Sequence, residues 1–144
     1  MNPTFKISSR DATHLLEGLV KVNQAQIQRR KKKGTYRPFF ILRSIQNGDL
    51  RYKKADPIEH WKSYEELHSS VTDEKMAGTI KGGADCEDLS AAVVAEFREE
   101  GIPARTYVYH ARPKLYHVIV HTDRWGLLDP SITAGMKPFK PRKK

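Results

Sequence analysis

Cysteine is almost absent from this chain of 144 residues, and long apolar runs are missing altogether. Cys86 is the only cysteine, which excludes an internal disulfide and favours a reducing compartment such as the cytoplasm. No apolar stretch approaches the roughly 20 residues that a membrane-spanning helix needs. Residues 1–10 lack the apolar centre of a secretory signal. The length predicts one compact domain with tails that folds without a metal or a cofactor.

Acidic residues are scarce in two parts of the chain, although the net charge of +9 does not show this. Residues 21–54 hold eleven lysines and arginines against one acid, and residues 137–144 hold five against none. The intervening segment, 55–136, holds fourteen acids and eight basic residues. We therefore expect three parts with different tasks: a basic N-terminal extension (1–55), a core (56–136) and a basic tail (137–144).

The N-terminal third predicts a helix followed by a hairpin. Apolar residues recur at helical spacing over residues 11–30, and Gly34 is expected to end that helix. Residues 39–45 are rich in aromatic and branched side chains and precede Asn47-Gly48, a pair typical of type I′ turns, so two paired strands are expected there. Ser63 and Glu66 form a capping box for a short helix to about Ser70.

A basic run closes the first predicted helix. It consists of Arg29, Arg30, Lys31, Lys32 and Lys33. Aromatic residues follow at Tyr36, Phe39 and Phe40, and this mixture suits phosphate contact with base stacking. The alternative is a solvated helix end followed by a buried strand, and no nucleic-acid recognition motif is present.

Cys86 is predicted to lie in the first turn of a second long helix. Asp85 is well placed as the N-cap, and Gly101-Ile102-Pro103 ends the helix. The apolar residues that follow at helical spacing are Leu89, Val93 and Phe97. The thiol is therefore expected on the stripe that faces the core. Strands are expected at 104–110, 115–122 and 124–128, which gives an α+β fold with a helix packed on an antiparallel sheet.

The position of Cys86 favours a reactive thiol, but its neighbours oppose one. A helix N-terminus lowers a thiol pKa, whereas Glu87 and Asp88 raise it if their carboxylates point inward. A lone cysteine can equally be an inert buried side chain. Both interpretations stay open on these residues alone.

Histidines and an aspartate follow Cys86 in an order that suits catalysis. His117 and His121 lie on one face of a strand, about 13 Å apart at the strand rise, which is too far to chelate one metal, so no metal site is expected. His110 and His121 are expected to be ordinary strand residues. Asp129 follows the next strand, where it can cap a turn or orient His117 toward Cys86.

Three segments in this order resemble the transglutaminase-like branch of the papain-like thiol enzymes. They are "GGADCEDLSAA" with "GIPAR" at 101–105, "HVIV" at 117–120 and "WGLLDP" at 125–130, and the resemblance covers about residues 78–132. It implies that Cys86, His117 and Asp129 are catalytic, with Asp88 and Trp125 in supporting positions. It also implies that the backbone N–H of Cys86 contacts the oxyanion.

Two features depart from the family pattern. Ile119 stands where an aromatic residue usually follows the histidine, and the loop between His117 and Asp129 is short. The side-chain oxyanion donor is not assigned by the resemblance, and Trp61, Tyr64 or a glutamine are the candidates. Small members with basic extensions suggest a bacterial accessory protein or, if phage-encoded, a virion component.

These observations predict a cysteine hydrolase or transferase that acts on peptide or isopeptide amides through Cys86, His117 and Asp129. The alternative is a catalytically silent scaffold that binds an acidic protein or nucleic acid through its basic flanks. The triad requires the Cys86 sulfur within roughly 4 Å of one His117 ring nitrogen, and Asp129 at about 2.6–3.2 Å from the other.

Overall fold

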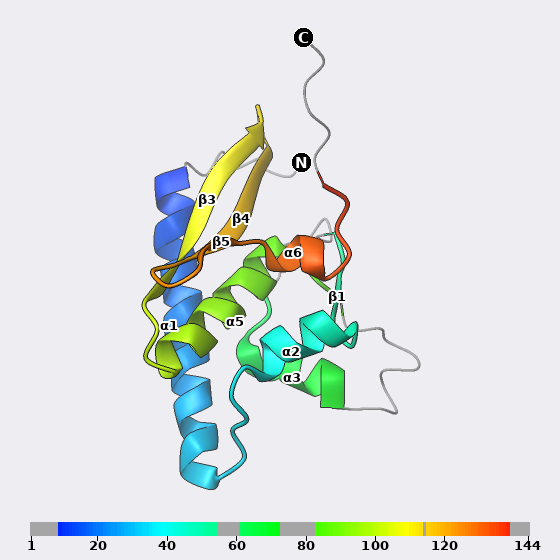
Figure 1. The fold of residues 1–144 in the computed structure, drawn as a ribbon. Helices are drawn as coiled ribbons and strands as arrows, with labels where there is room; N and C mark the ends of the chain where they lie inside the picture. The colour runs from blue at the N-terminus through cyan, green and yellow to red at the C-terminus, as the bar shows by residue number, and fades with distance from the viewer. Residues whose placement is uncertain (1–8, 55–60, 73–82, 114, 139–144) are drawn as a thin grey trace, which may run out of the picture.

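The structure, a computed structural model, describes residues 9–54, 61–72, 83–113 and 115–138. Within these residues it is a mixed α+β protein with five helices and a three-stranded antiparallel sheet (Figure 1). The elements are α1 (Ser9–Lys33), α2 (Phe40–Asn47), β1 (Arg51–Tyr52), α3 (Tyr64–Thr72), β2 (Gly83–Ala84), α5 (Cys86–Glu99), β3 (Ala104–Arg112), β4 (Leu115–Thr122), β5 (Gly126–Leu128) and α6 (Pro130–Thr133). The expected α+β class is confirmed, and a papain-like arrangement stays a prediction. The expected boundary at residue 55 and most of the basic tail lie outside the described residues.

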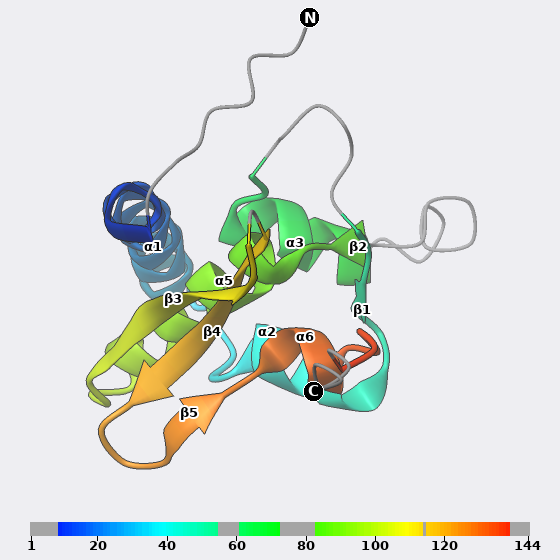
Figure 2. The ribbon, with the colours of Figure 1, turned by 90° about the horizontal axis from the view of Figure 1, so that it is seen from above.

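The sheet has β4 in its centre, with β3 and β5 on either side. The β3–β4 register pairs Tyr109 with His117, and the β4–β5 register pairs Val120 with Leu128. The helices α1 and α5 pack together on one face of this sheet (Figure 2). Among the described residues β5 stops opposite Val120, and no other strand pairs with the earlier part of β4 on that side. Ser90 in the second turn of α5 donates there to the Val118 carbonyl.

The first helix is predicted correctly and belongs to the main body of the fold. Leu16, Val20 and Ile27 of α1 are buried at helical spacing. Arg98 of α5 donates to both carboxylate oxygens of Glu17, at 2.6 and 2.7 Å, which clamps the two helices. At the end of α1, Gly34 has a φ of 73°, a conformation in which glycine avoids the steric penalty of a Cβ.

The predicted hairpin after residue 39 is wrong, because residues 40–47 form α2. Gly48 has a φ of 83°, the positive value that a type I′ turn also needs, but here Gly48 is the C-cap of α2. No local side chain caps the start of α2; the buried Glu96 of α5 accepts from the backbone N–H groups of Ile41 (2.8 Å) and Leu42 (2.9 Å). A carboxylate from elsewhere in the chain thus replaces the missing cap.

The predicted capping box of α3 is confirmed. The backbone N–H of Glu66 donates to Ser63 Oγ at 3.4 Å, and that of Ser63 donates to the Glu66 carboxylate at 3.2 Å. The helix runs to Thr72, two residues beyond the predicted end. Asn23 of α1 also accepts from the backbone N–H of Tyr64 at 2.7 Å, which ties α3 to α1.

Candidate active site

The start of α5 places Cys86 where the sequence predicts it. Asp85 is the N-cap, and it forms a capping box with Asp88: the N–H of Asp88 donates to Asp85 at 3.1 Å, and the N–H of Asp85 donates to Asp88 at 3.2 Å. Asp88 also accepts from the backbone N–H of Lys62 at 2.8 Å. The carboxylate of Asp88 therefore holds the helix start and the segment before α3 in place.

The thiol of Cys86 lies against β4. It is 9% exposed and packs with Leu16 and Val118, whereas Leu89, Val93 and Phe97 of the predicted stripe belong to the larger core. A hydrogen bond from the Val118 backbone favours the thiolate, and Ser90 Oγ donates to the Val118 carbonyl at 3.0 Å. The first turns of α5 thus satisfy the backbone of β4 on the side that β5 leaves uncovered.

The surroundings of Cys86 favour the protonated thiol. Burial raises its pKa well above the ordinary value, and the nearby carboxylate of Glu87 raises it further. The sulfur lies 3.6 Å from Glu87 Oε2, to which the S–H donates. The inward orientation of acids, which the sequence allowed as a reason for a raised pKa, is therefore the one observed.

Glu87 and Asp88 are themselves perturbed. Burial, together with the neighbouring Asp85 carboxylate, raises the pKa of Glu87 to about 8 and that of Asp88 to about 7. Glu87 Oε1 accepts from the Tyr116 hydroxyl at 2.9 Å. Because Tyr116 directly precedes His117, this hydrogen bond connects the residue after the candidate nucleophile to the residue before the candidate base.

His117 and Asp129 are in contact as predicted. The Nε2 atom of His117 lies 2.8 Å from Asp129 Oδ2, and the imidazole is 2% exposed. The distance from His117 to the Cys86 sulfur that the triad requires stays a prediction. With Nε2 joined to Asp129, the nitrogen assigned to the thiol is Nδ1.

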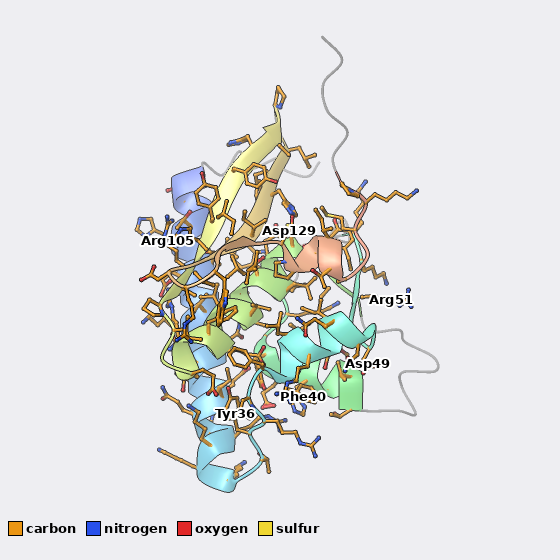
Figure 3. The ribbon with its side chains drawn as sticks, viewed as in Figure 1. Tyr36, Phe40, Asp49, Arg51, Arg105 and Asp129 are labelled. Atoms are coloured by element: carbon orange, nitrogen blue, oxygen red, sulfur yellow. The ribbon has the colours of Figure 1, made fainter. Side chains whose placement is uncertain are left out.

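Asp129 serves two neighbours at once. Its Oδ1 accepts from the backbone N–H groups of Ser131 (3.1 Å) and Ile132 (3.3 Å), so it caps α6, while Oδ2 contacts His117. Figure 3 shows Asp129 where β5 ends and α6 begins, above α5. Both sequence interpretations of this aspartate, a turn cap and a partner of His117, are therefore correct.

Two tyrosines flank the site. The charges of Cys86 and Asp129 act on both hydroxyls and, after burial, are among the causes that raise the pKa of Tyr52 in β1 and Tyr109 in β3. The Tyr109 ring meets the His117 ring edge to face, with centroids 5.7 Å apart. Neither tyrosine stood out in the sequence, because proximity to the site follows from the pairing of β3 with β4 and of β1 with β2.

Trp61 is the best placed of the candidate oxyanion donors. Its indole packs against the cluster that contains Cys86, and its buried Nε1–H has no hydrogen-bond partner among the described residues. The Tyr64 hydroxyl is also buried without such a partner, but its ring belongs to the larger core. The side chains of Gln24 and Gln26 are engaged elsewhere, with Glu99 and with the backbone of Glu65.

Other residues that the sequence singled out lie outside this cluster. Trp125 is 52% exposed, and its ring packs on Phe97 near the far end of α5, so it contacts the core edge and not the thiol. His121 lies four residues after His117 along β4, where it pairs with Leu127, and His110 lies near the end of β3. Among the described residues, no group of three or more histidines, cysteines or acids is placed to hold a metal.

Two residues of the basic run form ion pairs within the fold. Arg30 donates to both oxygens of Glu65 at 2.8 Å, and Lys31 forms an ion pair with Glu99 at 3.2 Å. The rings of Phe39 and Phe40 pack on Phe97 and His68, which removes them from base stacking. Figure 3 shows Tyr36 and Phe40 below Asp129, in the lower half of the molecule. The exposed cations of the run are Arg29, Lys31, Lys32 and Lys33, and of these Lys31 is the one paired with Glu99.

Comparison of the chain with known protein families, with curated proteins and with solved structures finds no match. None of the described helices combines the length and the apolar character needed to cross a membrane. The function must therefore be argued from the site.

Proposed function

We propose that the protein is a transglutaminase-like cysteine hydrolase or transferase that acts on peptide or isopeptide amides. The observation that carries the proposal is the 2.8 Å contact between His117 Nε2 and Asp129 Oδ2, in a chain whose only cysteine begins the helix α5. A histidine oriented by a carboxylate and a thiol at a helix start are the parts that nucleophilic acyl transfer needs. The resemblance of the three sequence segments supports the same class.

Each side chain has a defined role in the proposed reaction. The Cys86 sulfur attacks the amide carbonyl carbon, and its proton passes to His117. The imidazolium, stabilised by Asp129, gives that proton to the leaving amine as the C–N bond breaks, which leaves a thioester on Cys86. Water then regenerates the thiol and releases an acid, or an amine does so and forms a new amide.

The oxyanion of the tetrahedral intermediate needs donors that are already in place. We assign the backbone N–H of Cys86 and the indole N–H of Trp61 to this task. The unpartnered Nε1 of Trp61 supports the second assignment, because a buried donor without an acceptor is unfavourable unless a ligand supplies one.

A catalytically silent scaffold is the second candidate, and two observations favour it. The thiol pKa is raised, and Cys86 and His117 are both buried, so the resting site is closed to a substrate. In that case the exposed cations at the end of α1 would provide the binding surface, for an acidic protein or a nucleic acid.

The two candidates are separated by incubating the protein with a mixed peptide library and a primary amine, followed by mass spectrometry. The proposed enzyme produces new peptide ends, deamidated side chains or amine adducts, and each outcome identifies the reaction. The products must disappear in Cys86→Ala and His117→Ala and persist in His121→Ala, which removes a histidine of the same strand. A wild-type protein that yields none of these products would favour the scaffold.

A further inference from the structure

Glu87 contacts the candidate nucleophile, yet the proposed reaction gives it no role. Its side chain is 5% exposed, and both of its oxygens are engaged. Oε2 accepts from the Cys86 thiol at 3.6 Å, and Oε1 accepts from the Tyr116 hydroxyl at 2.9 Å. A carboxylate fixed at two points inside the protein has little freedom to turn away from the sulfur.

Titratable groups surround the Cys86 thiol from several elements. Asp85 and Glu87 at the start of α5 act on the thiol, Tyr52 of β1 and Tyr109 of β3 feel its charge, and Tyr116 of β4 packs against its cluster. His117 of β4 and Asp129 before α6 are the other titratable members of the candidate triad. The charged groups that perturb the thiol are acids, and Glu87 is the acid in contact with it. Above its own pKa of about 8, Glu87 places a negative charge beside the sulfur, and a thiolate next to this like charge in a buried site is unfavourable.

We infer that the Glu87 carboxylate keeps the Cys86 thiol protonated in the resting protein, and that the Tyr116 hydroxyl fixes Glu87 in this position. Glu87 is therefore a positioning residue that acts through the thiol. The consequence for catalysis rests on the proposed function: a substrate or partner that displaces or neutralises Glu87 would release the nucleophile. The ionisation itself does not depend on any activity.

Alkylation by iodoacetamide tests this inference directly, because Cys86 is the only cysteine in the chain. A sulfur–carbon bond forms, iodide leaves, and the thiol proton goes to solvent, so the rate follows the thiolate fraction. We expect the wild-type alkylation rate to reach half of its maximum at a pH above the free-cysteine pKa of about 8.5. This pH is the midpoint. In Glu87→Gln, which removes the charge with little change of shape, the midpoint should fall by at least about one pH unit.

Two further variants control for structure and for net charge. Tyr116→Phe removes the hydroxyl that fixes Glu87 but leaves the thiol and the carboxyl in place, and its midpoint should fall by a smaller amount. Asp49→Asn removes one exposed carboxylate between α2 and β1, far from the site (Figure 3), and should leave the midpoint unchanged. Thermal unfolding shows whether each variant is folded, and if Glu87→Gln is not, Tyr116→Phe decides the matter.

An unchanged midpoint in a folded Glu87→Gln, or a wild-type midpoint at or below about 8.5, would overturn the inference. A shift in Asp49→Asn as large as that in Glu87→Gln would do the same, since it would indicate a general charge effect. The outcome is independent of the proposed function. If the midpoint falls in Glu87→Gln but the wild-type protein yields no peptide products, the inference about Glu87 stands and the proposed enzymatic function is wrong. If peptide products form but the midpoint does not move, the proposed function stands and the inference about Glu87 is wrong.

Discussion

Acidic side chains that are wholly or partly buried lie at both ends of α5, all of them on α5 except Glu17 of α1, but the groups around these side chains differ. At the C-terminal end, Arg98 holds the pKa of Glu17 below its usual value. There too, against the effect of burial, hydrogen bonds from Gln24 and Lys31 lower the pKa of Glu99. At the N-terminal end, burial and the neighbouring Asp85 carboxylate raise the pKa values of Glu87 and Asp88.

The acids at the two ends of α5 therefore have different roles, structural at the C-terminal end and, in our interpretation, functional at the N-terminal end. The C-terminal acids have cationic or amide partners and join α5 to α1. At the N-terminal end, the fold raises the pKa values of Glu87 and Asp88. Perturbed pKa values of this kind are typical of functional sites. Substitutions at one end of α5 test whether the other end responds.

The largest loss of activity is expected for Asp129→Asn, a change at the N-cap of α6 that also affects the contact with His117. Asparagine still caps a helix well, so α6 and the free energy of unfolding should change little. The amide cannot stabilise an imidazolium as a carboxylate does, and activity on the best library peptide should fall by about 10²–10⁴-fold. Asp123→Asn, in the exposed turn before β5, is the matched control. Full activity in Asp129→Asn would contradict the triad.

Trp61→Phe should lower kcat by about 10²–10³-fold and change KM little, because the indole N–H is assigned to the oxyanion. Phenylalanine keeps an aromatic ring against the cluster around Cys86. Trp125→Phe is the control, since Trp125 packs at the other end of α5, and its kcat should stay at the wild-type value. Equal losses in both variants would favour a general packing effect.

The sequence predicts the helix at Cys86 and the Asp129–His117 contact because their signals are local. Asp85 and Gly101 mark the two ends of α5, and a short loop returns the chain from His117 to Asp129. These features depend on residues that are close along the chain, so spacing alone reveals them.

The sequence predicts α2 wrongly and leaves the orientation of Glu87 open, because distant contacts decide both. The cap of α2 comes from Glu96, and Phe39 before it takes a left-handed φ of 56°, which no local pattern indicates. Asn47-Gly48 fits a hairpin or a helix end equally well. The side that Glu87 faces depends on how α5 docks on β4, and an acid beside a cysteine is exposed by default.

At the C-terminal end, Arg98→Met should destabilise the protein by about 1–3 kcal/mol in urea unfolding. It removes the paired hydrogen bonds to Glu17 and one to the Ala104 carbonyl at 2.9 Å. The iodoacetamide midpoint of Cys86 should not move, because the change lies at the other end of α5. Lys21→Met, which removes an exposed partner of the same Glu17, should have an effect below about 0.5 kcal/mol.

The smallest effect is expected in the pH dependence of stability. The pKa values of Glu87, Asp88 and Glu96 are raised in the folded protein to about 8, 7 and 8. Between the unfolded values near 4 and these folded values, the native state binds more protons than the unfolded state. The free energy of unfolding should therefore fall as pH rises from about 5 to 8, by about 1–2 kcal/mol after relaxation of the buried groups, and level off above 8.

Glu96→Gln removes the contribution of one acid to the pH dependence of the free energy of unfolding. Glu96 caps α2 and does not contact the thiol, so the variant should flatten part of the pH profile and leave the Cys86 midpoint unchanged. Glu87→Gln should flatten another part and move the midpoint, which links that share of the pH dependence to the site. Urea unfolding at several pH values measures both. Stability that rises between pH 5 and 8 in the wild-type protein would show that these acids are ionised and compensated, and the contrast between the two ends of α5 would be lost.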